Sequence, residues 1–141
     1  MLSMSIRGFL GLRPRDKKAR KMKKLIKIDS ACAVVAICYV SGIDEETVLR
    51  VCRSCGFEAG EGMLDEEWMD AAKQLGIRFR RLVIPEMRLK RFMAEHNEGL
   101  YFVGTIDHLF VVDNGILIDP RHPTPPGLGR IVKHAWRVDK R

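Results

Sequence analysis

The feature that most constrains this 141-residue chain is an apolar segment, residues 30–41, without a single charged side chain. Its apolar residues occupy all sides of a helical projection, which predicts a helix buried on every side. Asp29 or Ser30 can accept hydrogen bonds from the amides of the first turn, and Gly42 is suited to end the helix. Other elements must cover such a helix, so we expect one globular domain built around it.

Two helical patterns follow, one starting at Asp44 and one covering residues 65–75, and both open with acidic residues that a helix dipole favours. After Gly76 the hydrophobic period changes to two, which is typical of strands. Strands are expected at residues 77–83, 100–103, 108–112, 116–118 and 131–138. A short basic helix is expected from Pro85 to about Glu95. This order predicts an α+β fold, with N-terminal helices packed on a C-terminal antiparallel sheet.

Basic residues concentrate at the N-terminus. Residues 1–27 hold ten of the 25 Lys and Arg residues and only one of the 18 Asp and Glu residues, so the remainder is nearly neutral. We therefore divide the chain into a basic N-terminal arm, residues 1–28, and a domain of residues 29–141. An anionic partner, either nucleic acid or a membrane surface, would contact residues 13–27, and a solubilising tail is the alternative.

The sequence favours a protein that is neither membrane-spanning nor exported. No stretch reaches the roughly 18 apolar residues that a transmembrane helix needs. The main basic block follows the apolar residues of positions 1–12, whereas a secretory signal places its charges first. We therefore expect a cytoplasmic protein, in which cysteines serve as thiols, ligands or nucleophiles rather than in disulfides.

Cys32 is the cysteine best placed to act as a nucleophile. A thiol attacks as the thiolate, and the amides and dipole at a helix start lower its pKa. Cys32 lies two or three residues inside the predicted helix start, whereas Cys38 lies mid-helix and Cys52 and Cys55 lie near the end of the next helix. The structural alternative is that Cys32 is a small buried hydrophobe.

His108 and Asp119 flank a predicted β-hairpin whose turn is formed by residues 113–115. With that turn centred on residues 113–114, the two side chains oppose each other. Asp119 can then hold one imidazole nitrogen while the other faces Cys32. The structural alternatives are a strand-start histidine bonded to the backbone and an Asp-Pro turn at residue 119.

Other chemistry-bearing residues have structural interpretations. Cys52 and Cys55 have the spacing of half a zinc site, and His122 and His134 are the remaining ligand candidates, although no second ligand pair follows. Four aromatic residues are expected in the core: Trp68, Phe79, Phe92 and Phe110. Five basic residues are expected to be solvated rather than to line a groove: Arg78, Arg80, Arg81, Lys90 and Arg91.

The residues singled out above also match a family pattern over residues 29–138. The matching segments are Cys-Ala-Val-Val-Ala-Ile-Cys-Tyr-Val-Ser-Gly at 32–42, Gly-Leu-Tyr-Phe-Val at 99–103, and His-Leu-Phe-Val-Val-Asp-Asn-Gly-Ile-Leu-Ile-Asp at 108–119. This combination resembles small papain-like cysteine peptidases, especially compact and often phage-encoded relatives of the peptidases that process double-glycine-leader bacteriocins. The resemblance implies a papain-like fold, Cys32 as nucleophile, His108 as general base and acid, and Asp119 as orienting group. It implies no metal or organic cofactor.

One position departs from that family. The family usually has a Gln about six residues before the cysteine as an oxyanion donor, and here the position is Lys27, a less preorganised donor. Two functions therefore stay open. The first is a thiol hydrolase, a peptidase or amide/isopeptide hydrolase acting on a protein or peptide in the cytoplasm, with a phage-infected host or a virion as possible settings. The second is an inactive papain-like binding or assembly protein whose basic arm contacts nucleic acid or another anionic surface.

Overall fold

The computed structural model describes residues 31–58, 60–106, 108–118 and 127–140. The basic arm, Lys27, Asp119 and His122 lie outside the described residues. The elements in chain order are α3 (Cys32–Ser41), α4 (Glu45–Ser54), α5 (Asp65–Gln74), β1 (Arg78–Arg81), β2 (Met87–Arg88), α6 (Leu89–Glu95), β3 (Leu100–Gly104), β4 (Leu109–Asp113), β5 (Ile116–Ile118), β6 (Ile131–Val132) and β7 (His134–Lys140). The predicted mixed α+β class is confirmed.

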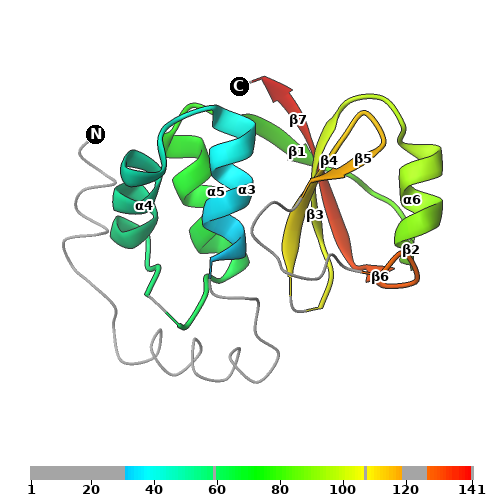
Figure 1. Cartoon of the computed structure of the whole chain (residues 1–141), viewed down its shortest axis with the longest axis horizontal. Helices are drawn as coiled ribbons and strands as arrows, with labels where there is room; N and C mark the ends of the chain where they lie inside the picture. Colours follow the sequence, from blue (N-terminus) through cyan, green and yellow to red (C-terminus); the bar gives the residue numbers. More distant parts are fainter. Residues whose placement is uncertain (1–30, 59, 107, 119–126, 141) are drawn as a thin grey trace.

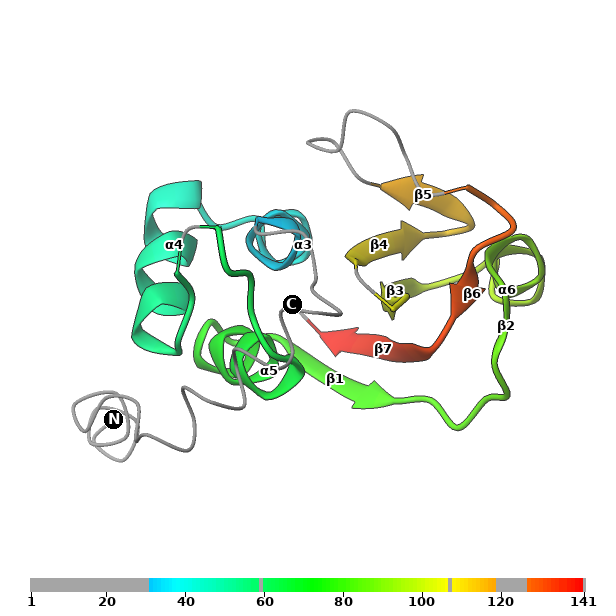
Figure 2. The same ribbon diagram turned by 90° about the horizontal axis from the view of Figure 1, so that it is seen from below.

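The strands β1, β7, β3, β4 and β5 form one sheet in that spatial order, and every neighbouring pair is antiparallel. Strands β2 and β6 form a separate two-stranded ribbon. Helices α3, α4 and α5 lie on one side of the large sheet, and α6 with the ribbon lies on the other side (Figures 1 and 2). The sheet is therefore covered on both faces.

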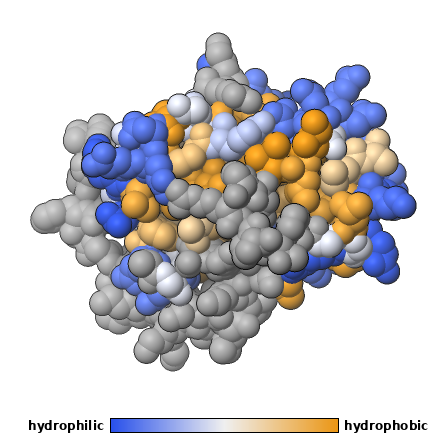
Figure 3. Space-filling view, in the orientation of Figure 1, coloured by the Kyte–Doolittle hydropathy of each residue, from blue (hydrophilic) through white to orange (hydrophobic). Residues whose placement is uncertain are grey.

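Side-chain alternation along the strands divides the core between these two faces. In β4, Leu109 and Val111 belong to the buried cluster on the side of α3–α5, whereas Phe110 and Val112 belong to the cluster on the α6 side. Figure 3 shows hydrophobic residues gathered over the middle of one face of the molecule, between hydrophilic residues at either end. The α3–α5 side of the sheet carries the larger cluster and also Cys32.

The centre of that larger cluster is aromatic. The ring of Trp68 lies 4.8 Å from the ring of Phe102 and 4.9 Å from that of Trp136, measured between centroids. Trp68, Phe92 and Phe110 are buried as predicted, and Phe79 packs against the cluster while partly buried. The five basic residues expected to be solvated are all exposed.

Two predicted elements are wrong at their boundaries. The helix expected from Pro85 begins at Leu89, because Met87 and Arg88 pair with β6 instead. The single strand expected at residues 131–138 is divided into β6 and β7 at Lys133, whose amide donates to the carbonyl of Gly104 at 2.8 Å. Both differences arise from pairings between segments far apart in the chain, to which a local pattern does not respond.

Candidate active site

Cys32 is the first residue of α3, and thus lies closer to the helix start than predicted. The residue before it, Ala31, is the N-cap and contributes no side-chain hydrogen bond. The helical ladder begins with the amide of Val35, which donates to the carbonyl of Ala31 at 3.1 Å. Cys32 therefore lies at the positively polarised end of the helix, and its side chain is only 5% exposed.

His108 lies in the loop that joins β3 to β4. The loop closes where Gly104 pairs with Leu109 and the amide of Thr105 donates to the carbonyl of His108 at 2.9 Å. The imidazole is 3% exposed, and its centroid lies 5.6 Å from that of the Phe110 ring. Packing and loop hydrogen bonds therefore hold His108 in place at the start of β4.

A hydrogen bond connects the start of α3 with the start of β4. The amide of Leu109 donates to Sγ of Cys32 with a nitrogen–sulfur distance of 3.4 Å, although the two residues are 77 positions apart. The start of α3 thus meets the start of β4 directly after His108. An amide that donates to sulfur stabilises its negative charge, as does the helix start. Cys32 therefore lies in surroundings that favour the thiolate in two ways.

The hairpin after His108 has a different register from the predicted one. The pairs Val111–Ile118, Val112–Leu117 and Asp113–Ile116 centre the turn on residues 114–115, not on 113–114. Asn114 and Gly115 both have positive φ, 50° and 79°, as a two-residue hairpin turn requires. The register of these strands therefore does not place positions 108 and 119 directly opposite each other.

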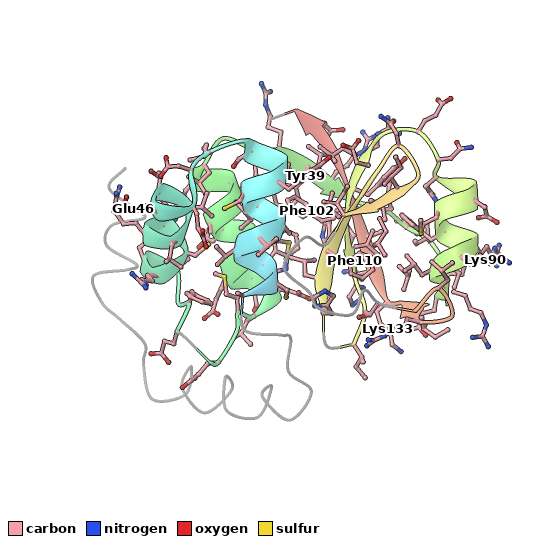
Figure 4. All side chains as sticks on the ribbon, in the orientation of Figure 1. Tyr39, Glu46, Lys90, Phe102, Phe110 and Lys133 are labelled. Carbon is pink, nitrogen blue, oxygen red and sulfur yellow. The ribbon has the colours of Figure 1, made fainter. Side chains whose placement is uncertain are left out.

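Asp113 is the last residue of β4 rather than part of the turn. Its carboxylate accepts a hydrogen bond from the hydroxyl of Tyr39 at 2.6 Å. Figure 4 shows Tyr39 between α3 and the sheet. This contact joins the end of α3 to the end of β4, so the helix and strand are connected by hydrogen bonds near both of their ends.

The other cysteines have different surroundings, and none of the four forms a disulfide. Cys52 is fully buried on α4, and burial raises the pKa of its thiol to about 12. Cys55 is the C-cap residue of α4, and Nε2 of Gln74 lies 3.3 Å from its sulfur. Burial disfavours the thiolate of Cys52, whereas the sulfur of Cys32, although also buried, accepts a hydrogen bond from an amide.

Metal binding finds no support among the described residues, where no group of three or more His, Cys, Asp or Glu side chains could hold an ion. His134, a predicted zinc candidate, instead lies with Nδ1 2.7 Å from Nη2 of Arg81. In the same part of the chain, no helix has the length and apolar character needed to cross a membrane.

The structure thus brings Cys32 to the backbone beside His108 and leaves Asp119 and Lys27 outside the described residues. Sequence reasoning missed the Leu109 amide and the Arg81–His134 pair. A main-chain donor cannot be recognised from the type of its residue. The two members of the Arg81–His134 pair are 53 positions apart, so no local pattern links them. No protein-family model, curated protein or solved structure matches this chain.

Proposed function

We propose that the chain is a cysteine hydrolase that cleaves an amide, peptide or isopeptide bond in a protein or peptide substrate. The observation that carries the proposal is the 3.4 Å contact between the Leu109 amide and Sγ of Cys32. It brings the first residue of a buried helix to the strand that follows a buried histidine. The proposal requires His108 to reach Cys32 from the start of that strand, because a thiol nucleophile needs a base within hydrogen-bond distance.

In this proposal Cys32 attacks the substrate carbonyl as a thiolate, and His108 holds the thiol proton. Collapse of the tetrahedral intermediate breaks the carbon–nitrogen bond, and His108 gives its proton to the leaving amine. The product that stays on the enzyme is an acyl-thioester. His108 then removes a proton from water, whose oxygen attacks the thioester and releases the acid and the Cys32 thiol.

Asp119 is the proposed orienting group for His108. The resemblance to papain-like peptidases supports this role, because their pattern has an aspartate at this spacing after the histidine. A carboxylate at this position would accept a hydrogen bond from the imidazole N–H and fix its tautomer. Asp119→Asn should therefore lower turnover at neutral pH more than it lowers binding.

The proposed oxyanion donors are the main-chain amide of Cys32 and the side chain of Lys27. The position of Cys32 at the start of α3 supports the first donor, because the first amides of a helix have no hydrogen-bond acceptor within the helix. Loss of one donor of this kind typically costs about 100- to 1,000-fold in turnover. Lys27→Gln, which restores the family's residue, is expected to retain or raise activity.

The burial of Cys32 and His108, 5% and 3% exposed, favours a second candidate function. A substrate must reach the thiol, and a papain-like scaffold that only binds or assembles needs no such access. In that case the basic arm would contact nucleic acid or another anionic surface, in the cytoplasm of a phage-infected host or in a virion. Deletion of residues 1–27 would then abolish binding and its steep dependence on salt.

The experiment that tests the hydrolase is the pH dependence of iodoacetamide alkylation at each cysteine of the native protein, read by mass spectrometry. We expect Cys32 to react fastest and to keep reacting well below an ordinary thiol pKa of about 8.5. His108→Ala should abolish the reaction at low pH, and Cys32→Ala identifies the modified peptide. Modification of Cys32 no faster than that of Cys55 would refute the proposal and leave the binding protein.

A further inference from the structure

The Arg81 side chain makes an unusual contact with the His134 imidazole on the neighbouring strand. Nη2 of Arg81 lies 2.7 Å from Nδ1 of His134. A guanidinium can only donate hydrogen bonds, so Nδ1 must accept and the imidazole must carry its proton on Nε2. The contact orients the guanidinium of Arg81, whose remaining N–H groups can donate to an acceptor. Two N–H groups of one guanidinium match the two oxygens of a carboxylate.

Three basic side chains among residues 77–140 have a carboxylate partner, and Arg81 is among the described basic residues that do not. Nη1 of Arg80 lies 3.7 Å from Oδ1 of Asp139. Nε of Arg91 lies 2.7 Å from Oε2 of Glu95, and Nζ of Lys133 lies 3.3 Å from Oε2 of Glu86. Among the described residues, no carboxylate lies within ion-pair distance of Arg81, whose contact is the neutral His134. The positive charge at Arg81 is therefore not neutralised by the described part of this chain.

The pair lies on the sheet face that carries Cys32. His134 is paired with Gly104, and Gly104 is paired with Leu109, so these three residues form one row across β7, β3 and β4. A Cβ placed on Gly104 would meet the ring of Trp136, which belongs to the α3–α5 side of the core. Two strand spacings separate His134 from Leu109, or about 10 Å. An extended peptide covers that distance with about three residues.

The charges differ between the helical part of the sequence and the part that follows it. Residues 31–76 contain three Lys and Arg against nine Asp and Glu, whereas residues 77–140 contain eleven against seven. Figure 4 shows Glu46 at one end of the molecule and Lys90 and Lys133 toward the other. An acidic peptide is therefore repelled by the helical half and attracted by the half that contains Arg81.

We propose that Arg81 and His134 form a subsite that binds an acidic side chain, Asp or Glu, about three residues from the bond that Cys32 attacks. The inference rests on the proposed hydrolase and names its substrate class. Arg81 donates two hydrogen bonds to the carboxylate, and His134 holds the guanidinium in the orientation that this requires. The subsite binds substrate and takes no part in the chemical step.

The test uses peptides of the form chloroacetyl-(Gly)n-Glu-amide, with n from 0 to 3, and matched Gln peptides. The Cys32 thiolate displaces chloride and forms a thioether, so each labelling rate reports how the peptide is held. We expect one or two of the Glu peptides to label Cys32 about tenfold faster than their Gln partners, the effect of one charge-assisted hydrogen bond. Arg81→Gln should abolish that difference, whereas Arg80→Gln, on the same strand but opposite face, should retain it.

A binding readout keeps this result separate from reactivity. Acetyl-Gly-Gly-Glu-amide is titrated into the full chain while the imidazole NMR signals of His134, assigned with His134→Gln, are followed. Shifts with the Glu peptide but not its Gln partner, absent in Arg81→Gln, support the subsite even if Cys32 proves unreactive. Equal labelling by Glu and Gln peptides at every length, together with an unshifted His134, overturns the subsite and leaves a reactive Cys32 unaffected.

Discussion

Two buried cysteines in this molecule lie in opposite chemical surroundings. Cys32 is the first residue of α3, and its sulfur accepts a hydrogen bond from the Leu109 amide at the start of β4. Cys52 is completely buried on α4, and its burial together with nearby Cys55 and Cys38 raises its pKa. The two thiols are almost equally inaccessible to solvent. Burial opposes the thiolate at both sites, and at Cys32 a helix start and an amide donor act in the other direction.

The largest expected difference is in reactivity. With a pKa of about 12 against an ordinary value of 9.0, Cys52 holds a far smaller thiolate fraction than it would in an unfolded chain. Native Cys52 should therefore be alkylated about 1,000-fold more slowly at pH 7 than Cys52 in urea. Cys32 should show no such suppression. Competition labelling with light and heavy iodoacetamide measures both ratios, and equal suppression at the two sites would remove the contrast.

The second prediction replaces each thiol by a hydroxyl. Cys52→Ser places a hydroxyl among apolar side chains and should lower the free energy of unfolding by about 1–3 kcal/mol. Cys32→Ser should cost less than about 1 kcal/mol, because the Leu109 amide can donate to the new oxygen. Urea unfolding of both variants and the wild type measures the difference. A larger loss for Cys32→Ser would show that the Leu109 contact does not provide a polar site.

The third prediction concerns pH. Between pH 9 and 12 the unfolded chain loses the Cys52 proton that the folded chain retains, so stability falls as pH rises through this window. The loss attributable to Cys52 should be about 1.4 kcal/mol by pH 10. Urea midpoints at pH 8, 9 and 10 measure it. Cys52→Ala is the control, since it should be less stable at pH 8 but lose less on going to pH 10.

The smallest effect is expected at the other end of the α3–β4 contact. Tyr39→Phe removes the 2.6 Å hydrogen bond to Asp113 while retaining the ring. Because this bond is partly exposed, its loss should cost about 1 kcal/mol in urea unfolding. The alkylation rate of Cys32 should change less in Tyr39→Phe than in His108→Ala. A large fall in Cys32 reactivity would instead mean that the whole helix position depends on Tyr39.

Much of the fold could be predicted because local patterns and local structure agree. The starts of α4 and α5, with acidic first turns, and the stop at Gly42, with φ of 71°, follow from residue types that suit those positions. The hairpin at Asn114–Gly115 was also predicted, but its register was not. The register of a two-residue hairpin depends on which two residues adopt a positive φ. Here these residues are Asn114 and Gly115.

The sequence by itself determined the helix-then-sheet order and the apolar character of α3, six of whose ten residues are buried. Periodicity and capping act within a few neighbouring residues, so they can be read without the fold. Only the tertiary structure decided that the Leu109 amide meets Cys32, that Arg81 faces His134, and that α6 begins after a strand pairing. Each of these contacts joins segments between about 40 and 80 positions apart. Their partners are chosen by packing and strand order, for which the local sequence contains no pattern.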